Sequence, residues 1–223
     1  MSFEFNEEKH EYTLDGERLP SVTEILSPLQ AESFAAINPA VLQAAADRGT
    51  AVHEITETMD YDLDYEDLIA PDLVPFADAY EEFLMDHEVE WQGIEMPVHF
   101  FEQYAGTVDR FGYIDGTPAV LDIKTVQSPS VEQKVSVCCQ LYAYDRAIKA
   151  CFPEFQGKHL AHLALYLKKD GSYKLFDCRE FAAKDDLDPS AIWTDLWNIY
   201  EFKRLAISKL NAIKDKHRRR TPK

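Results

Sequence analysis

Apolar residues recur at two different spacings along this chain, and the change of spacing separates a helical region from a strand-rich one. Residues 21–88 place apolar side chains three and four positions apart, which predicts amphipathic helices. From Val89 onward, β-favouring residues occur in short runs bounded by turn residues, which predicts strands. The predicted elements are a strand at 10–14, helices within 21–88, strands at about 89–101, 106–114, 117–124, 159–168 and 173–178, and helices at about 130–150 and 188–213.

Local signals indicate where the first helices begin. Ser21 and Glu24 have the spacing of a capping box, so we expect a helix to open there. Asn38 followed by Pro39 places a cap residue before a proline that suits the first helical turn. A second helix is therefore predicted through the alanine-rich residues 40–47.

The second helical segment is expected to be interrupted and then to resume. Residues 48–50 read Arg-Gly-Thr, and apolar spacing returns after them and runs to Met59, with His53 on this part of the helix. The acidic residues 60–72 are predicted to form a solvated loop, and residues 73–87 a further amphipathic helix.

The order of elements predicts one α/β domain over residues 1–213, with a central sheet covered by helices. Within it we expect N-terminal helices at 21–88, a sheet and helix at 89–178, and a closing helix at 188–213. Residues 214–223 are basic and are predicted to form a mobile, solvated tail, with contact to a phosphate backbone as the alternative.

Charge is distributed unevenly along the 223 residues. The formal net charge is -17, which argues against a protein that coats nucleic acid or anionic membrane indiscriminately. Residues 1–100 hold 24 acidic residues and three basic ones, whereas residues 101–223 hold 16 and 20. Any contact with a polyanion is therefore expected on one face formed by the later part of the chain.

Neither a membrane segment nor a targeting segment is predicted. No run approaches the roughly 20 apolar residues that a membrane span needs, and the start of the chain lacks the features of a signal peptide, so a cytoplasmic protein is expected. The four cysteines include no C-x-x-C pair and are predicted to be buried thiols.

Asp115-Gly116 predicts a tight hairpin between the strands at 106–114 and 117–124, because a type I′ turn needs positive φ at both central residues. A two-residue loop sets Asp109 directly across from Asp122. Opposed like charges destabilise a ladder by up to about 1 kcal/mol. The two carboxylates therefore indicate a cation between them.

Lys124 lies two residues beyond Asp122 and is expected on the same face of the hairpin, with Val108, Leu121 and Ile123 on the other. Mg²⁺ and Mn²⁺ are suitable cations, since hard divalent ions take carboxylate oxygens and water. The alternative, left open by spacing alone, is a surface hairpin in which the lysine screens two aspartates.

Five short segments carry a resemblance to a known family. Residues 106–110 (GTVDR) and 121–125 (LDIKT) resemble the two-part signature of the PD-(D/E)xK nuclease superfamily, in its RecB-like, phage-type exonuclease branch. Residues 48–54 (RGTAVHE) resemble the upstream histidine helix of that branch, residues 140–144 (QLYAY) its Q-x-x-x-Y helix, and residues 19–23 (LPSVT) the opening of phage-type members. The family's proline before the first aspartate is replaced here by valine.

The resemblance implies a restriction-endonuclease-like domain, with a mixed central sheet flanked by helices, and a Mg²⁺- or Mn²⁺-dependent deoxyribonuclease. It implies that Asp109, Asp122, the carbonyl of Ile123 and His53 hold the metal, and that Lys124 is the catalytic lysine. No iron–sulfur cluster is expected, because the clustered cysteines of the relatives that carry one are missing.

Further residues are carried over with open roles. Glu95 is predicted to bind the metal or to hold one of its ligands, and Glu57 to orient His53, with an exposed helical glutamate as the alternative. Gln140 and Tyr144 share a helix face and are predicted to line the site or contact a nucleotide, with packing as the alternative for the tyrosine. The motif residues Arg110 and Thr125 are also expected to contact substrate.

The expected activity is hydrolysis of DNA phosphodiester bonds, as an exonuclease of phage or recombination type. A structure-specific or flap endonuclease and a non-catalytic DNA-binding subunit are the alternatives. The resemblance implies DNA, a single-strand annealing or recombination protein, and further copies of the chain as partners, and no membrane.

Overall fold

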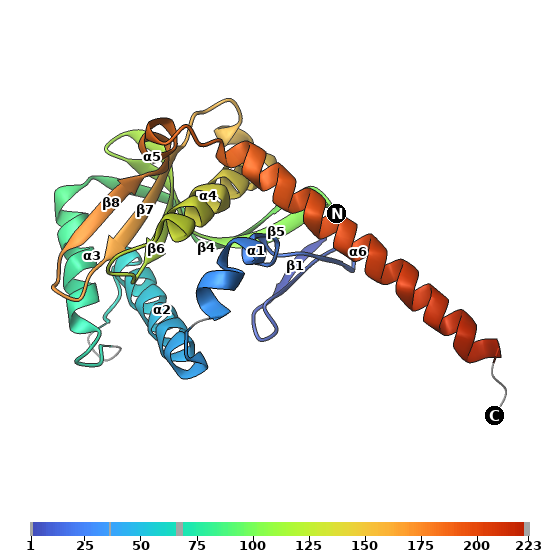
Figure 1. Ribbon diagram of the computed structural model, residues 1–223. Coiled ribbons are helices and arrows are strands. Elements are labelled where there is room, and N and C mark those ends of the chain that lie inside the picture. Colours follow the sequence, from blue (N-terminus) through green and yellow to red (C-terminus); the bar gives the residue numbers. More distant parts are fainter. Residues whose placement is uncertain (1, 36, 66–68, 221–223) are drawn as a thin grey trace.

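The computed structural model describes residues 2–35, 37–65 and 69–220 and shows helices packed on both faces of a central sheet (Figure 1). The elements in chain order are β1 (Phe3–Asn6), β2 (Glu11–Leu14), β3 (Glu17–Leu19), α1 (Val22–Ala35), α2 (Pro39–Asp60), α3 (Val74–Asp86), β4 (Val89–Phe100), β5 (Tyr104–Ile114), β6 (Thr117–Lys124), α4 (Val131–Cys151), η2 (Pro153–Phe155), β7 (Ala161–Leu167), β8 (Tyr173–Asp177), α5 (Cys178–Lys184) and α6 (Pro189–Arg220).

The central sheet is mixed, as predicted. Its strand order is β4-β5-β6-β7-β8, with β6 and β7 parallel and the other neighbours antiparallel. The parallel pair is joined by α4, as a crossover connection requires. A second sheet, β1-β2-β3, has three short antiparallel strands. The α/β class is therefore confirmed.

Two apolar clusters separate the helices into layers. One cluster joins α1, α4 and the start of α6 to one face of the sheet, and the other joins α2 and α3 to the opposite face. The side chains of β7 point alternately to the two faces and so contribute to both clusters. Ala164 and Tyr166 belong to the first cluster, and Leu163, Leu165 and Leu167 to the second. The sheet is thus buried on both faces, and polar groups within it need partners inside the protein.

The hairpin register agrees with the predicted two-residue loop. Ile114 pairs with Thr117 and Arg110 with Leu121, and both Asp115 and Gly116 have positive φ. The predicted position of Val108 is wrong, because Val108 packs in the α4-side cluster whereas Leu121 and Ile123 pack against α2 and α3. Phe111 lies in the same cluster as Val108, so strict alternation fails between these two residues.

Three helix predictions need correction. α2 runs without a break through Gly49, and the hydroxyl of Thr50 donates to the carbonyl of Ala46, so the expected interruption is wrong. The segment 60–72 is not wholly a solvated loop, since the side chain of Asp60 is buried; residues 66–68 lie outside the described part. α6 continues to Arg220, so residues 214–220 are helical rather than a mobile tail, and 221–223 are not described.

Two further observations concern the whole described chain. Among the described residues no helix is long and apolar enough to cross a membrane. The four cysteines are free thiols, three of them buried and Cys151 partly so.

Candidate functional site

The site lies where the ladder between β5 and β6 ends. The last backbone pair is Arg110 with Leu121, and beyond it a side chain replaces the backbone acceptor, because Oδ2 of Asp109 accepts from the backbone N–H of Ile123 at 2.7 Å. The strands therefore part around a buried carboxylate instead of pairing to their ends. This places the side chain of Asp109 between the two strands, where it is only 10% exposed to solvent.

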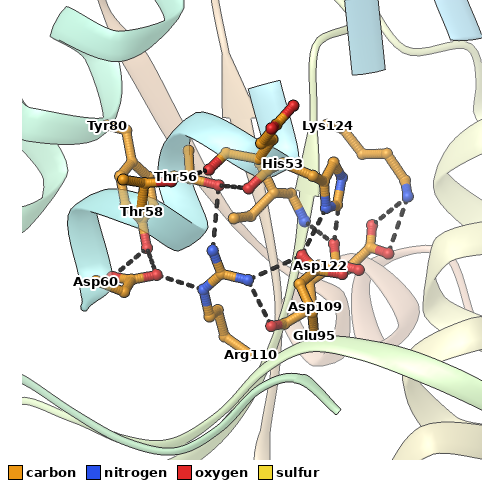
Figure 2. Close-up of polar contacts among 12 residues, drawn as sticks. His53, Thr56, Thr58, Asp60, Tyr80, Glu95, Asp109, Arg110, Asp122 and Lys124 are labelled. Carbon is orange, nitrogen blue, oxygen red and sulfur yellow. Dashed lines mark hydrogen bonds and ion pairs between the residues drawn. The ribbon is translucent and has the colours of Figure 1, made fainter. Parts of the chain in front are cut away.

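His53, Glu95 and Asp109 form a cluster of potential metal ligands from α2, β4 and β5 (Figure 2). One nitrogen or oxygen from each lies within 4.8 Å of the others. Nδ1 of His53 is 2.9 Å from Oε1 of Glu95, and Nε2 is 3.7 Å from Oδ2 of Asp109. Glu95 thus orients the imidazole through one nitrogen, which leaves the other facing Asp109.

An irregular backbone carries Glu95 to this position. Its φ is 43°, a left-handed value that is costly for a residue other than glycine. Burial disfavours the charged form of Glu95, but the hydrogen bond from His53 and the charge of Arg110 outweigh it and lower the pKa of Glu95. Burial likewise disfavours charged His53, yet Asp109 and Glu95 raise the His53 pKa to about 9.

Asp122 and Lys124 form a second, adjacent group on the face covered by α4. Nζ of Lys124 lies 2.8 Å from Oδ2 of Asp122, and Nε2 of Gln140 donates to Oδ1 at 2.9 Å. Burial, which outweighs the opposing effect of Lys124, raises the pKa of Asp122 to about 6. The predicted direct opposition of Asp109 and Asp122 in the ladder is wrong, because strand pairing ends at Arg110 and Leu121. The two side chains still lie at one site, with Asp109 toward His53 and Asp122 toward Gln140.

Arg110 has a structural position that differs from its predicted contact with substrate. Its side chain is fully buried, with Nε donating to Asp60, Nη2 to Thr56 and Nη1 to Glu95 (Figure 2). Asp60 also accepts from Tyr80 Oη at 2.8 Å and Trp91 Nε1 at 2.9 Å. Arg110 therefore joins a buried network to a candidate metal ligand, and no surface remains for a nucleotide.

Asp60 is the site-supporting residue that sequence reasoning missed. It lies 50 positions from Arg110 along the chain, at the end of α2 and the start of a strongly acidic stretch. The aspartates that follow it lie in the same acidic sequence, so the local sequence predicts a solvated carboxylate at each of these positions, Asp60 included. Only the fold shows that this one is buried against an arginine, and a buried charge of this kind requires such a partner.

The remaining predicted residues lie at or beside the site. Tyr144 is buried on α4 one turn after Gln140, and a Cβ added to Gly106 would lie 2.7 Å from its ring. Thr125 follows β6 directly and is partly buried. Glu57 lies one turn beyond His53, but the residue that contacts the imidazole is Glu95. The carbonyl of Ile123 as a metal ligand and the substrate contact of Thr125 stay predictions.

The donor set fits a hard divalent cation. Two carboxylates and an imidazole, from Glu95, Asp109 and His53, offer ligand atoms within 4.8 Å of one another, and Asp122 lies beside them in an ion pair with Lys124. Carboxylate oxygens suit Mg²⁺ and Mn²⁺, and imidazole is also a common metal ligand. His53, Glu95 and Asp109 would hold the ion, with Asp122 adjacent.

A cavity of about 180 Å³ adjoins the site on the α4 side. Lys124 and Gln140 form its inner edge, while Gln30, Gln133 and Ser136 offer polar groups. Val126, Pro129, Val137 and Tyr166 supply apolar walls.

Comparisons with known proteins leave the family undecided. No protein-family model matches the chain, and no curated protein matches it. Membership of the RecB-like nucleases stays a prediction based on the five motif segments.

Proposed function

We propose that this protein is a metal-dependent deoxyribonuclease with a restriction-endonuclease-like domain, and that it acts as an exonuclease. The observation that carries the proposal is the convergence of His53, Glu95, Asp109, Asp122 and Lys124 at one end of the sheet. They come from α2, β4, β5 and β6, segments up to 71 positions apart. Four of them lie in the motif segments, and Glu95 is the acidic residue predicted on the preceding strand. A surface hairpin with a screening lysine would need neither the histidine nor burial of its carboxylates.

His53, Glu95 and Asp109 would bind Mg²⁺ or Mn²⁺. A bound ion of this kind supplies Lewis acidity at a phosphoryl oxygen and lowers the pKa of coordinated water. Glu95 holds His53 in one orientation, and Arg110 holds Glu95, so the ligands are fixed before any ion arrives.

Lys124 acts through its charge rather than as a proton acceptor. Burial disfavours its charged form, but Asp122 and Asp109 outweigh this and raise the pKa of Lys124, so Nζ carries a proton at neutral pH. A fixed cation beside the two aspartates would stabilise the negative charge that grows on phosphate oxygens during attack. Asp122 and Gln140 keep the ammonium group and the carboxylate at defined positions.

The cavity beside Lys124 and Gln140 supports action on a strand whose bases are accessible. It has a volume of about 180 Å³ and lies beside the catalytic lysine, and in this proposal it receives a single unpaired base next to the scissile phosphate. A base inside an intact duplex is stacked and paired, and extracting it costs a few kcal/mol. Free or frayed ends avoid this cost, which favours an exonuclease over an endonuclease.

The test is cleavage of 5′- and 3′-labelled single- and double-stranded DNA and of a covalently closed circle, in Mg²⁺, in Mn²⁺ and in EDTA. We expect metal-dependent release of short products from linear DNA. Asp122→Asn and Lys124→Ala should each lower the rate at least about a hundredfold, since removing one charge-stabilising group commonly costs 10²–10³.

Matched controls are Asp78→Asn and Lys174→Ala, whose side chains are exposed on α3 and β8 and should leave the rate unchanged. Cleavage of the closed circle would change the assignment to an endonuclease. Binding of metal and DNA without cleavage would indicate a DNA-binding subunit. Full activity of Asp122→Asn together with Lys124→Ala would rule out this site as the catalytic one.

A further inference from the structure

The C-terminal helix α6 has two halves in different surroundings. Trp193 and Leu196, near its start, are buried in the cluster shared with α1 and α4. The helix then leaves the body of the protein and runs clear of it to Arg220 (Figure 1). α6 lines a groove with α1 as far as Ile207, and in the described part of the chain no other helix or sheet lies beside its last turns. A single helix of this length is only marginally stable in water.

The projecting half exposes a series of large apolar side chains. The six are between 44% and 73% exposed: Ile199, Phe202, Leu205, Ile207, Leu210 and Ile213. Isolated exposed apolar residues are ordinary, but a contiguous series on one element indicates an interface. Ile199, Phe202, Leu210 and Ile213, with Ala206 between them, are spaced by three, four, four and three positions and so share one face.

The spacing of apolar residues along this face is nearly the same from either end of the helix. Around Ala206, Ile199 mirrors Ile213 and Phe202 mirrors Leu210. Leu205 and Ile207 flank the same centre. Two identical helices laid antiparallel with Ala206 at the crossing point would match every apolar residue with an apolar partner. Alanine at the crossing lets the two backbones approach closely.

Charge favours the same orientation. Asp185, Asp186, Asp188 and Asp195 lie at or just before the start of α6, whereas Lys214 and Lys216 lie near its end. An antiparallel pair sets Asp195 of one chain level with the segment 214–217 of the other. A parallel pair would bring like charges together, and its aligned helix dipoles would repel.

We propose that α6 is the interface of a homodimer, in which two copies pair antiparallel about a twofold axis that passes by Ala206. A twofold interface requires a self-complementary surface, and the reversal symmetry of this face provides one. Neither DNA nor a lipid surface would require that symmetry. Basic residues alone would suffice for DNA, and an apolar face of any order would suffice for a membrane.

The first measurement is the mass of the full-length protein in solution by sedimentation and by light scattering, across a range of concentrations. We expect a dimer for the unaltered chain and for Ser208→Asp, which lies on the opposite side of the helix. Phe202→Asp should give a monomer, with at least a hundredfold weaker association. A monomeric unaltered chain, or a Phe202→Asp variant that stays dimeric, would overturn the proposal.

A second measurement tests the orientation. Ala206→Cys should form a disulfide between two chains under mild oxidation, because position 206 faces itself across the axis. Ile199→Cys should not, since position 199 faces 213 in an antiparallel pair. The native thiols, three of them buried and Cys151 partly so, give the background, measured on the unaltered chain. The reverse result, with cross-linking at 199 and none at 206, would contradict the antiparallel arrangement.

Discussion

Asp109 completes the hairpin ladder with its side chain, since its Oδ2 accepts the hydrogen bond that the backbone N–H of Ile123 would otherwise give to the neighbouring strand. One carboxylate therefore has two tasks, pairing β5 with β6 and contributing to the candidate metal centre. The two tasks make different demands on the side chain. Any oxygen in the right place can accept from Ile123, whereas the cation needs negative charge.

The two tasks of Asp109 can be separated by substitution. Asp109→Ala leaves the buried N–H of Ile123 unpaired, which should lower the free energy of unfolding by about 1–3 kcal/mol. Asp109→Asn keeps an oxygen acceptor, so most of the stability should remain while metal binding and cleavage are lost. Urea unfolding and Mn²⁺ titration of both variants check this. Equal stability of the two variants would contradict the role of the side chain in strand pairing.

Asp60 supports the site without touching it. Asp60→Ala removes one of the two acidic partners of the fully buried Arg110, and breaking a buried pair costs up to about 3–5 kcal/mol. We expect a large loss of stability, and weaker metal binding in whatever folds, because Arg110 also holds Glu95.

The double variant Asp60→Leu with Arg110→Met should recover much of the stability lost in Asp60→Ala, since an apolar pair avoids the unpaired charge. It should not recover metal affinity, because the Arg110→Met substitution removes the arginine that holds Glu95. Asp72→Ala, an exposed aspartate after the same helix, is the matched control and should behave as the unaltered chain. Thermal unfolding and Mn²⁺ titration measure both effects.

Metal binding should release a proton from His53. In the metal-free protein Asp109 and Glu95, against the effect of burial, raise the His53 pKa to about 9, so the imidazole is charged at pH 7.5 and must lose its proton to bind a cation. Affinity should therefore rise with pH up to about 9, by at most tenfold per unit. Calorimetric Mn²⁺ titrations in two buffers of different ionisation enthalpy give the proton count. His53→Gln should abolish the release, and a zero count for the unaltered chain would argue against His53 as a ligand.

Gly106 is required by packing rather than by backbone conformation. A Cβ at this position would lie 2.7 Å from Cε1 and 3.2 Å from Oη of the buried Tyr144. Gly106→Ala should therefore cost about 1–3 kcal/mol, the usual range for overpacking, and displace the tyrosine that contacts Gln140. Shortening the tyrosine in Gly106→Ala with Tyr144→Leu should restore part of that loss. Chemical unfolding of the single and double variants decides the point.

Local chemistry made the hairpin predictable. Asp-Gly specifies one turn type and hence one register, so Arg110 could be paired with Leu121 from the sequence. The capping signals at Ser21 and Asn38 likewise agree with the helix starts that the structure shows. Such signals act within a few residues and do not depend on the rest of the chain.

What the sequence could not supply depends on distant packing. The left-handed φ of Glu95 coincides with the break in alternation that turns Val108 to the α4 side, and nothing near Val108 signals it. The burial of Asp60 depends on three partners 20 to 50 positions away. The candidate ligands were predicted one by one, but the ion pair of Arg110 with Asp60 that holds Glu95 in place was not.

The buried ion pair between Arg110 and Asp60 also determines the electrical balance of the site. The site and the network that supports it hold four carboxylates, Asp60, Glu95, Asp109 and Asp122, and Arg110 and Lys124 neutralise two of them. With His53 neutral, two negative charges remain. A single divalent cation held by His53, Glu95 and Asp109 would cancel them.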